Sequence, residues 1–401
     1  MYKAMTEGAQ PGLMKKIAVA AVLLSCLLGF DLPFPGGTIA TGYAAPAASP
    51  PGVTQTRHRR RRRIIRHSRR RRRVVRRTWS PWNVSSYDDH PGAGDNTEGE
   101  DPAVRQAAIA ALGNWNGTIV VVNPHTGRIL AIVNQKLAIS SAFRPCSTFK
   151  PIVALAGLNR GVISPSTRLR VGRRWHIDVT EALAHSNNQF FFRLGEMLGF
   201  RTLSGYAQDF GLGRKAGWDI PEESPGEFPD VAPADGVGNL AYLGEGIEVT
   251  PLQMAAVVSA IANGGTLYYL QHPRTPEEIE NFQPRVRRQL THLSAHIPEV
   301  RAGMAAAVRY GTARLANGAG TDILGKTGTC SEDGARLGWF DSYSAEHPKY
   351  VVVVLLRGGR PMFGPHAAEI AGRFYQVLRE TGHPEVQASG TEPAGHASQL
   401  P

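Results

Sequence analysis

The segment 145–155 reads Pro-Cys-Ser-Thr-Phe-Lys-Pro-Ile-Val-Ala-Leu. The hydroxyl of Ser147 is followed three positions later by Lys150, and an apolar run begins directly after it. Residues three apart share one face of a helix, so a helix beginning here brings Lys150 to the Ser147 oxygen. A serine is a weak nucleophile until a neighbouring base takes its proton, and burial near other cations can keep a lysine neutral. The segment therefore predicts an activated serine at the N-terminus of a buried helix.

Ser186-Asn187-Asn188 is the second motif, and it precedes the aromatic run 190–192. A hydroxyl at Ser186 fits a proton relay between Lys150 and a leaving amine. The amide of Asn188 offers a donor and an acceptor, which suits binding of a peptide backbone.

Lys326-Thr327-Gly328-Thr329 is the third motif. Lys326 adds positive charge for a substrate that ends in a carboxylate, Gly328 allows a close approach of the backbone to the substrate, and the threonines supply hydroxyls. If the segment is an edge strand, it can bind an extended peptide by strand addition. The backbone N–H groups of Ser147 and Thr329 are then the expected oxyanion donors.

The three motifs are informative as a set. At average composition a chain of this length contains about one S-x-x-K and about one S-x-N by chance, whereas well under ~0.1 K-T-G-T is expected. Their occurrence in this order therefore favours one catalytic site over three unrelated segments.

The fold class follows from the arrangement of apolar runs. Residues 118–122 and 128–133 flank the turn 123–127 and predict a hairpin, and residues 350–356 predict another buried strand. Between them Thr250 and Pro251 begin a helical pattern that ends at Gly264. Strands at both ends with helices between them predict an α+β fold with one sheet built from distant segments.

The positive charge of the chain belongs to one tract. The formal net charge is +12, but residues 57–77 contain fourteen arginines and no acid, so the rest is close to neutral. Such a tract is expected to be disordered when free. We predict a disordered linker over 45–101 that contains this tract, a folded domain over 102–385 and a flexible tail over 386–401.

The N-terminal region predicts export. Lys15 and Lys16 precede an apolar stretch from Ile17 to Phe30, which is typical of a signal and short for a bilayer span of ~20 residues. Residues 1–44 are interpreted as an export signal or membrane anchor, with both alternatives open. The expected location is the periplasm or the outer face of the cytoplasmic membrane.

The motifs resemble those of the transpeptidase domain of penicillin-binding proteins, within the serine D,D-peptidase and β-lactamase superfamily, whose signature is S-x-x-K, S-x-N and K-T-G. The segments 210–213 and 220–226 resemble the family further, and Gly-Glu-Gly-Ile-Glu-Val-Thr-Pro-Leu-Gln at 244–253 does so closely. The similarity extends over about residues 115–378. No glycosyltransferase domain or large pedestal is apparent, so the resemblance indicates a small monofunctional type.

This resemblance implies a β-lactamase/transpeptidase-like fold, an antiparallel sheet flanked by helices. It implies D-Ala-D-Ala stem peptides of peptidoglycan as substrates, β-lactams as covalent inhibitors, and no metal or cofactor. Glu223 and Glu245 are interpreted as turn and packing residues. The implied roles are nucleophile, base and relay for Ser147, Lys150 and Ser186, and substrate binding for Asn188, Lys326, Thr327, Gly328 and Thr329.

The resemblance also suggests a disulfide between Cys146 and Cys330. In this fold the nucleophile helix packs against the K-T-G strand, and class A carbapenemases, similar in fold, carry a disulfide at the matching positions. An exported protein meets an oxidising compartment. The alternative is two buried thiols that only touch.

Other functions stay open at this stage. A D,D-carboxypeptidase uses the same residues. A serine β-lactamase is disfavoured, because the Tyr-Gly-Asn triplet of class D and the E-x-x-L-N loop of class A are absent. A non-turnover β-lactam sensor is a third reading. Nucleic-acid binding through Arg57–Arg77 conflicts with export, so this tract is expected to contact anionic envelope polymers or lipids, or to act as a spacer.

Overall fold

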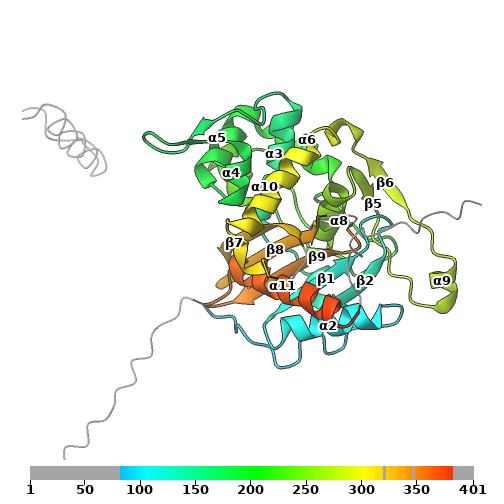
Figure 1. The fold of residues 1–401 in the computed structure, drawn as a ribbon. Helices are drawn as coiled ribbons and strands as arrows, with labels where there is room; N and C mark the ends of the chain where they lie inside the picture. Colours follow the sequence, from blue (N-terminus) through cyan, green and yellow to red (C-terminus); the bar gives the residue numbers. More distant parts are fainter. Residues whose placement is uncertain (1–81, 319–321, 346–347, 383–401) are drawn as a thin grey trace, which may run out of the picture. The chain divides into compact units, whose positions relative to one another are not determined.

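A five-stranded sheet is the centre of the fold. The computed structural model describes residues 82–318, 322–345 and 348–382 (Figure 1). Within them the strand order is β2-β1-β9-β8-β7, and all neighbouring pairs are antiparallel. The predicted sheet from distant segments is confirmed, and β7 forms one edge. The strands are β1 (Gly117–Val122), β2 (Ile129–Val133), β7 (Ile323–Glu332), β8 (Ala335–Ser344) and β9 (Val351–Gly358).

Two of the inner strands, β1 and β9, are mainly apolar without alternation because both faces of the sheet are covered. Every residue of β1 is buried. Val120 lies opposite Ile132 of β2 and opposite Val353 of β9. A short apolar run without alternation is what a strand buried on both faces requires.

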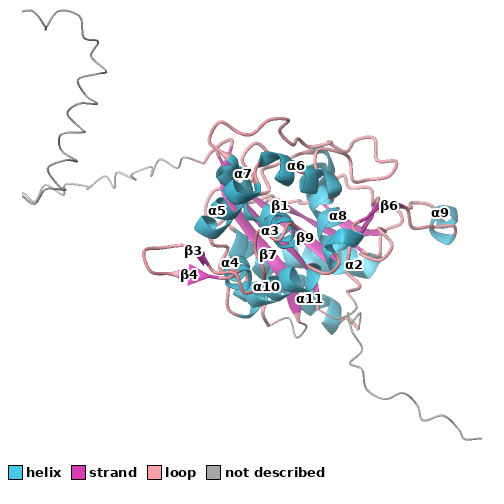
Figure 2. Ribbon diagram, turned by 90° about the horizontal axis from the view of Figure 1, so that it is seen from above, coloured by secondary structure: helices cyan, strands magenta, loops and turns pink. Residues whose placement is uncertain are grey.

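Helices cover the two faces of the sheet (Figures 1 and 2). On one face α2 (Pro102–Leu112) and α11 (Gly364–Glu380) share a core with Phe340 of β8. On the other face α8 (Pro251–Ala262) and α3 (Lys150–Asn159) share a core with Trp339. The other α-helices of the described residues are α4 (Val179–Ala184), α5 (Asn188–Leu198), α6 (Phe200–Asp209), α7 (Val237–Leu243), α9 (Pro276–Glu280) and α10 (Ile297–Arg309). Two small hairpins pair β3 (Leu169–Arg170) with β4 (His176–Ile177) and β5 (Thr266–Tyr268) with β6 (Val286–Gln289).

The helix α8 begins where the sequence predicts. Thr250 Oγ1 accepts a hydrogen bond from the Gln253 N–H at 3.0 Å, and Gln253 Oε1 accepts one from the Thr250 N–H at 2.8 Å. This reciprocal capping satisfies two backbone donors, and Pro251 occupies the first helical position, where no N–H is needed. Since all residues of α8 are buried, capping by its own side chains removes the need for water at this end.

Residues 82–101 pack against the domain, so the prediction of a linker is wrong for this part. The Asn83 N–H donates to Gly334 O at 3.0 Å. The ring of Tyr87 stacks on that of Trp115, with 4.9 Å between centroids. The sequence signal failed because the segment lacks apolar periodicity and its contacts are made to residues far along the chain.

The acidic residues of this segment bind an arginine of α2. Arg105 pairs with Asp95 at 3.0 Å and with Glu100 at 2.8 Å. Glu100 is buried and also accepts from the Ile132 N–H at 3.0 Å. Burial, the largest influence, raises the pKa of Glu100, although the hydrogen bond from Arg105 opposes this.

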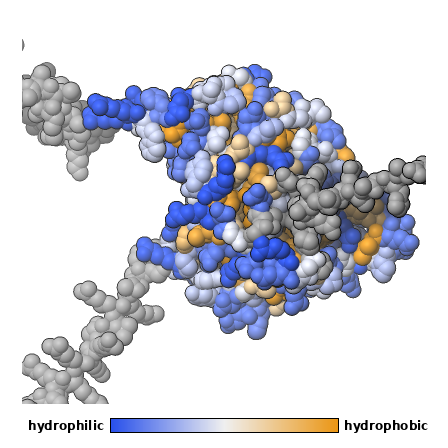
Figure 3. Space-filling view, viewed as in Figure 1, coloured by the Kyte–Doolittle hydropathy of each residue, from blue (hydrophilic) through white to orange (hydrophobic). Residues whose placement is uncertain are grey.

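The predicted export signal or anchor (1–44), the Arg-rich tract (57–77) and the tail (386–401) lie outside the described residues. In the described ranges, no helix has the length and apolar character needed to cross a membrane. The face seen in Figure 3 mixes hydrophilic and hydrophobic residues.

Glu100→Ala should lower the free energy of unfolding by about 3 kcal/mol, because it removes one of the two carboxylates that pair with Arg105 and leaves the Ile132 N–H without its acceptor. Urea unfolding of the variant and the wild type measures the difference. Glu98→Ala, at an exposed position of the same segment, is the control and should change stability by less than about 0.5 kcal/mol. Equal effects of the two substitutions would contradict the assigned role of Glu100.

Candidate active site

Ser147 lies on a turn of 3-10 helix that leads directly into α3. The turn, η2 (Cys146–Phe149), begins with Cys146 at φ 53°, a left-handed conformation that is uncommon outside glycine. Phe149 is fully buried and anchors the turn in the core, whereas Ser147 is half-buried. The Ser147 hydroxyl makes no hydrogen bond to another residue in the described part of the chain, so it is available to a ligand.

Lys150 is fully buried at the first position of α3. Its Nζ donates to Ser186 O at 2.8 Å and to Asn188 Oδ1 at 2.7 Å, and it lies 3.1 Å from Ser186 Oγ. The two carbonyl oxygens can only accept hydrogen bonds. A neutral amine has two hydrogens for them, which leaves its lone pair for a hydroxyl. The surroundings of Lys150 therefore suit a neutral base.

Ser186 and Asn188 lie where α4 ends and α5 begins. Ser186 adopts φ 51°, again in the left-handed region. Asn187 caps α5, with its Oδ1 accepting from the Phe190 N–H at 2.9 Å. Asn188 is exposed and binds Lys150 through its amide oxygen, so its amide hydrogens are available to a ligand.

Lys326 is a second fully buried lysine, on the edge strand β7. Its Nζ donates to Ser186 Oγ at 2.8 Å and to Thr327 O at 2.8 Å. The Ser186 hydroxyl thus lies between the Nζ atoms of Lys150 and Lys326. The structure brings the three sequence motifs together at this hydroxyl.

Burial changes the protonation of both lysines. Loss of hydration lowers the pKa of Lys150 well below its ordinary value, and the nearby charge of Lys326 lowers it further. Loss of hydration also lowers the pKa of Lys326 to about 7, against a smaller opposing effect of Asp341. The site therefore favours a neutral Lys150, while Lys326 can carry its charge near neutral pH.

The threonines of the third motif are held by the protein. Thr327 Oγ1 lies 2.6 Å from Thr312 Oγ1, so one hydroxyl donates to the other. Thr329 Oγ1 accepts from the Gly364 N–H at 2.8 Å. These contacts fix the backbone of β7 beside Ser186.

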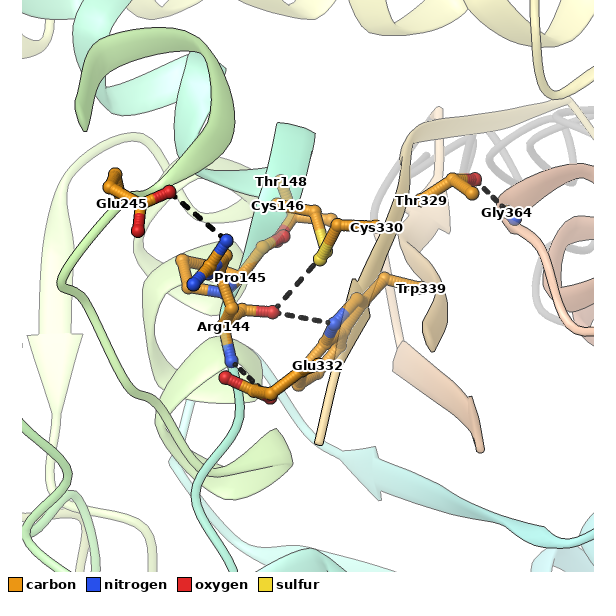
Figure 4. Close-up of a disulfide and its surroundings, with 10 residues drawn as sticks. All are labelled: Arg144, Pro145, Cys146, Thr148, Glu245, Thr329, Cys330, Glu332, Trp339 and Gly364. Carbon is orange, nitrogen blue, oxygen red and sulfur yellow. Dashed lines mark hydrogen bonds and ion pairs between the residues drawn. A yellow bond between two sulfur atoms is a disulfide. The ribbon is translucent and has the colours of Figure 1, made fainter. Parts of the chain in front are cut away.

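Cys146 and Cys330 form a disulfide that joins η2 to β7 (Figure 4). Their Cα atoms are 5.7 Å apart, although 184 positions separate them in the sequence. A Cβ at Gly328 would lie 3.0 Å from Pro145 O, so glycine lets the strand approach the nucleophile turn closely. Of the two alternatives for the cysteines, the structure has the bridge.

Arg144 positions the chain just before the disulfide (Figure 4). Its guanidinium pairs with Glu245 at 3.0 Å, and its backbone N–H donates to Glu332 at 3.2 Å. Its carbonyl accepts from Trp339 Nε1 at 3.0 Å. Glu245 thus holds the loop that carries the nucleophile turn, in keeping with its interpretation as a packing residue.

Glu223 also has a structural role. It is buried and accepts from the backbone N–H groups of Ala216 and Gly217, each at 2.7 Å. Across the described ranges, no group of three or more His, Cys, Asp or Glu side chains is arranged to hold a metal ion.

Two residues beside the site are missing from the sequence-based prediction. Thr312 contacts Thr327 from the segment after α10. Asp341 is fully buried on β8, in register with Lys326. Burial raises the pKa of Asp341 well above its usual range, against the opposing charge of Lys326. Asp341 directly follows the apolar pair Trp339-Phe340, but only the strand register shows that it lies opposite Lys326, and Thr312 carried no signal.

Residues 117–376 match the family described as penicillin binding protein transpeptidase domain. Stage V sporulation protein D of Bacillus subtilis is 29% identical over 311 residues, which cover 64% of this chain and 48% of that protein. The peptidoglycan D,D-transpeptidase MrdA of Acinetobacter baumannii is 23% identical over 367 residues, which cover 70% of this chain and 54% of that protein. The chain spans about half the length of these curated relatives.

A solved structure has a similar fold. It is the D,D-transpeptidase domain of a peptidoglycan glycosyltransferase from Eggerthella lenta, with a TM-score of 0.58 and 22% identity. The match covers 70% of this chain and 82% of that one. At this identity the similarity concerns the fold, and it confirms the predicted antiparallel sheet flanked by helices.

Alkylation of the unfolded, unreduced protein should modify neither Cys146 nor Cys330, and reduction should expose both thiols to mass spectrometric detection. Replacing both cysteines by alanine should lower the free energy of unfolding by up to about 5 kcal/mol, because the bridge closes a long loop in the unfolded chain. Cys26→Ala is the control and should have no such effect. Two alkylated thiols without reduction would rule the bridge out.

Proposed function

Because the chain belongs to the penicillin-binding protein transpeptidase family, we propose that it is a serine D,D-transpeptidase that cross-links peptidoglycan through an acyl-enzyme on Ser147. The supporting observation is the Ser186 hydroxyl between the Nζ atoms of two fully buried lysines. This arrangement provides a base for Ser147 and a path for its proton. The names of relatives support transfer to an amine over hydrolysis, since several are peptidoglycan D,D-transpeptidases.

Acylation begins with attack of Ser147 Oγ on the carbonyl carbon between the two terminal D-Ala residues of a stem peptide, while neutral Lys150 takes the hydroxyl proton. The backbone N–H groups of Ser147 and Thr329 stabilise the oxyanion. The peptide C–N bond then breaks, and the departing D-Ala amine receives a proton through Ser186. An amine of a second stem peptide finally attacks the ester and releases Ser147, with the proton transfers reversed.

Substrate binding follows from the charges and the free edge of the sheet. Lys326 binds the terminal carboxylate, and the amide of Asn188 binds the peptide backbone. The edge strand β7, through Thr327, Gly328 and Thr329, pairs with the extended peptide.

The same attack explains covalent inhibition by β-lactams. Ser147 opens the strained ring amide, and the amine that leaves stays attached to the acyl group, which blocks access of the second stem peptide. We expect the penicilloyl group to remain for minutes or longer, because the sequence lacks the deacylating carboxylate loop of class A β-lactamases.

The N-terminal segments complete the proposal. An enzyme of peptidoglycan acts outside the cytoplasm, which fits residues 1–44 as an export signal or anchor and a periplasmic or outer-face location. We propose that Arg57–Arg77 binds anionic envelope polymers or phospholipid head groups and that nucleic acid is no partner.

Deletion of 57–77 should leave penicillin labelling unchanged and weaken binding to phosphatidylglycerol vesicles at low salt. Equal binding with and without the tract would reduce it to a spacer.

Ser147→Ala should abolish covalent labelling by fluorescent penicillin, because its hydroxyl forms the acyl bond. Lys150→Ala should lose nearly as much, since the base and the nucleophile act as a unit. In-gel fluorescence measures the label, and Ser141→Ala, a nearby serine outside the site, should label like the wild type. Persistent label on Ser147→Ala would overturn the proposal, and rapid turnover of a chromogenic cephalosporin by the wild type would indicate a β-lactamase instead.

A further inference from the structure

Asp341 is a fully buried acid directly beside the substrate-binding lysine. It lies on β8 in register with Lys326 of β7. Opposite residues of antiparallel strands lie on the same face of the sheet, with Cβ atoms about 5 Å apart. Because Lys326 reaches Ser186 from this face, Asp341 lies on the side of the sheet that carries the site.

The Asp341 carboxyl has little support from hydrogen bonds. Neither oxygen has a hydrogen-bond partner among the described residues. The nearby hydroxyl of Thr148 lowers the pKa of this carboxyl, though less than Lys326 does. That hydroxyl donates its single proton to Pro145 O at 2.7 Å, so it has no proton left to donate to Asp341. A buried carboxylate without donors is strongly destabilising. An acid at this position therefore needs an explanation other than stability.

Few charged groups surround Asp341 in the part of the chain that the structure describes. From β7 and α3, Lys326 and Lys150 face the same buried region. From α10, Arg301 is directed elsewhere, with its guanidinium 5.6 Å from the ring of Tyr343 and donating to Ala345 O at 2.6 Å. The turn η2 adds no charge, since its cysteine is in the disulfide.

Ionisation of either Asp341 or Lys326 favours ionisation of the other. Burial lowers the pKa of Lys326, and the carboxylate opposes this. Burial raises the pKa of Asp341, and the ammonium opposes that. With Lys150 neutral, a charged Lys326 and a charged Asp341 together give a buried region of zero net charge.

We propose that Asp341 is a positioning residue that keeps Lys326 cationic, so that the site recognises a substrate by its terminal carboxylate. The inference rests on the proposed function of Lys326 in binding that carboxylate. Asp341 thereby favours an anionic substrate through Lys326, without touching the substrate itself.

The first test is the pH dependence of acylation by benzylpenicillin, measured as a second-order rate constant. In the wild type the rate should rise as Lys150 loses its proton and fall as the pH increases through about 7, where Lys326 loses its charge. In Asp341→Asn the fall should move to lower pH. A displacement of one pKa unit makes acylation about tenfold slower above this range. Asp341→Glu, which keeps the charge, should restore much of the wild-type profile.

A matched substrate separates charge recognition from damage to the site. Benzylpenicillin methyl ester lacks the carboxylate, so Asp341→Asn should change its rate by less than about twofold. Ser342→Ala alters the next residue of β8, a buried serine that donates to Val352 O at 3.0 Å, and should affect neither compound. An equal loss for both penicillins at every pH would show a merely structural role and overturn the proposal.

The second test needs no reaction. Nitrogen-15 NMR of the lysine side chains gives the pKa of Lys326 in the wild type and in Asp341→Asn, assigned with Lys326→Arg. A lower pKa in the variant supports the proposal, and an unchanged pKa overturns it. Asp341→Val, a second neutral variant suited to a buried strand, serves if the asparagine variant does not fold. Absence of acylation in the wild type would instead refute the proposed function. The NMR measurement would still test whether Asp341 raises the pKa of Lys326.

Discussion

The burial of two lysine side chains around one hydroxyl is the constraint on which the site depends. Removing an amine or ammonium group from water is costly unless its hydrogens find acceptors. Ser186 O and Asn188 Oδ1 accept from Lys150, while Ser186 Oγ accepts from Lys326. The first turn of α3, the turn before α5 and the edge strand β7 must therefore meet within hydrogen-bond distance. The positions of these three elements follow from this requirement.

The surrounding framework holds two unfavourable backbone conformations in place. Cys146 and Ser186 both adopt positive φ values, which cost about 1–3 kcal/mol each for residues with a side chain. The disulfide ties Cys146 to β7, and the fully buried Phe149 fixes the other end of its turn. Ser186 is held by both lysines. The strained residues and the contacts that hold them thus lie on the same elements as the catalytic residues: the turn η2, the turn before α5 and the strand β7.

The sequence predicts those parts of the structure whose signals are local. The β1–β2 hairpin and the cap of α8 at Thr250 depend on residues a few positions apart, and the three motifs carry recognisable residue types. Asp341 was not predicted, because its meaning depends on the strand register that places it opposite Lys326. The packing of residues 82–101 was missed for a related reason, since an acidic segment without periodicity resembles a linker until Arg105 is known to face it.

The two buried lysines share a hydroxyl yet need opposite protonation states, and their neighbours explain how one site supports both. Each loses hydration, which lowers both pKa values. Their charged neighbours differ: the cation Lys326 lowers the pKa of Lys150 further, whereas the carboxyl of Asp341, when ionised, raises the pKa of Lys326. Groups whose environments separate their pKa values divide the roles of base and cation between them. The effect on Lys326 comes from Asp341 on β8, the strand next to the edge strand β7. The protonation states of the two lysines therefore depend on a residue outside the three motifs.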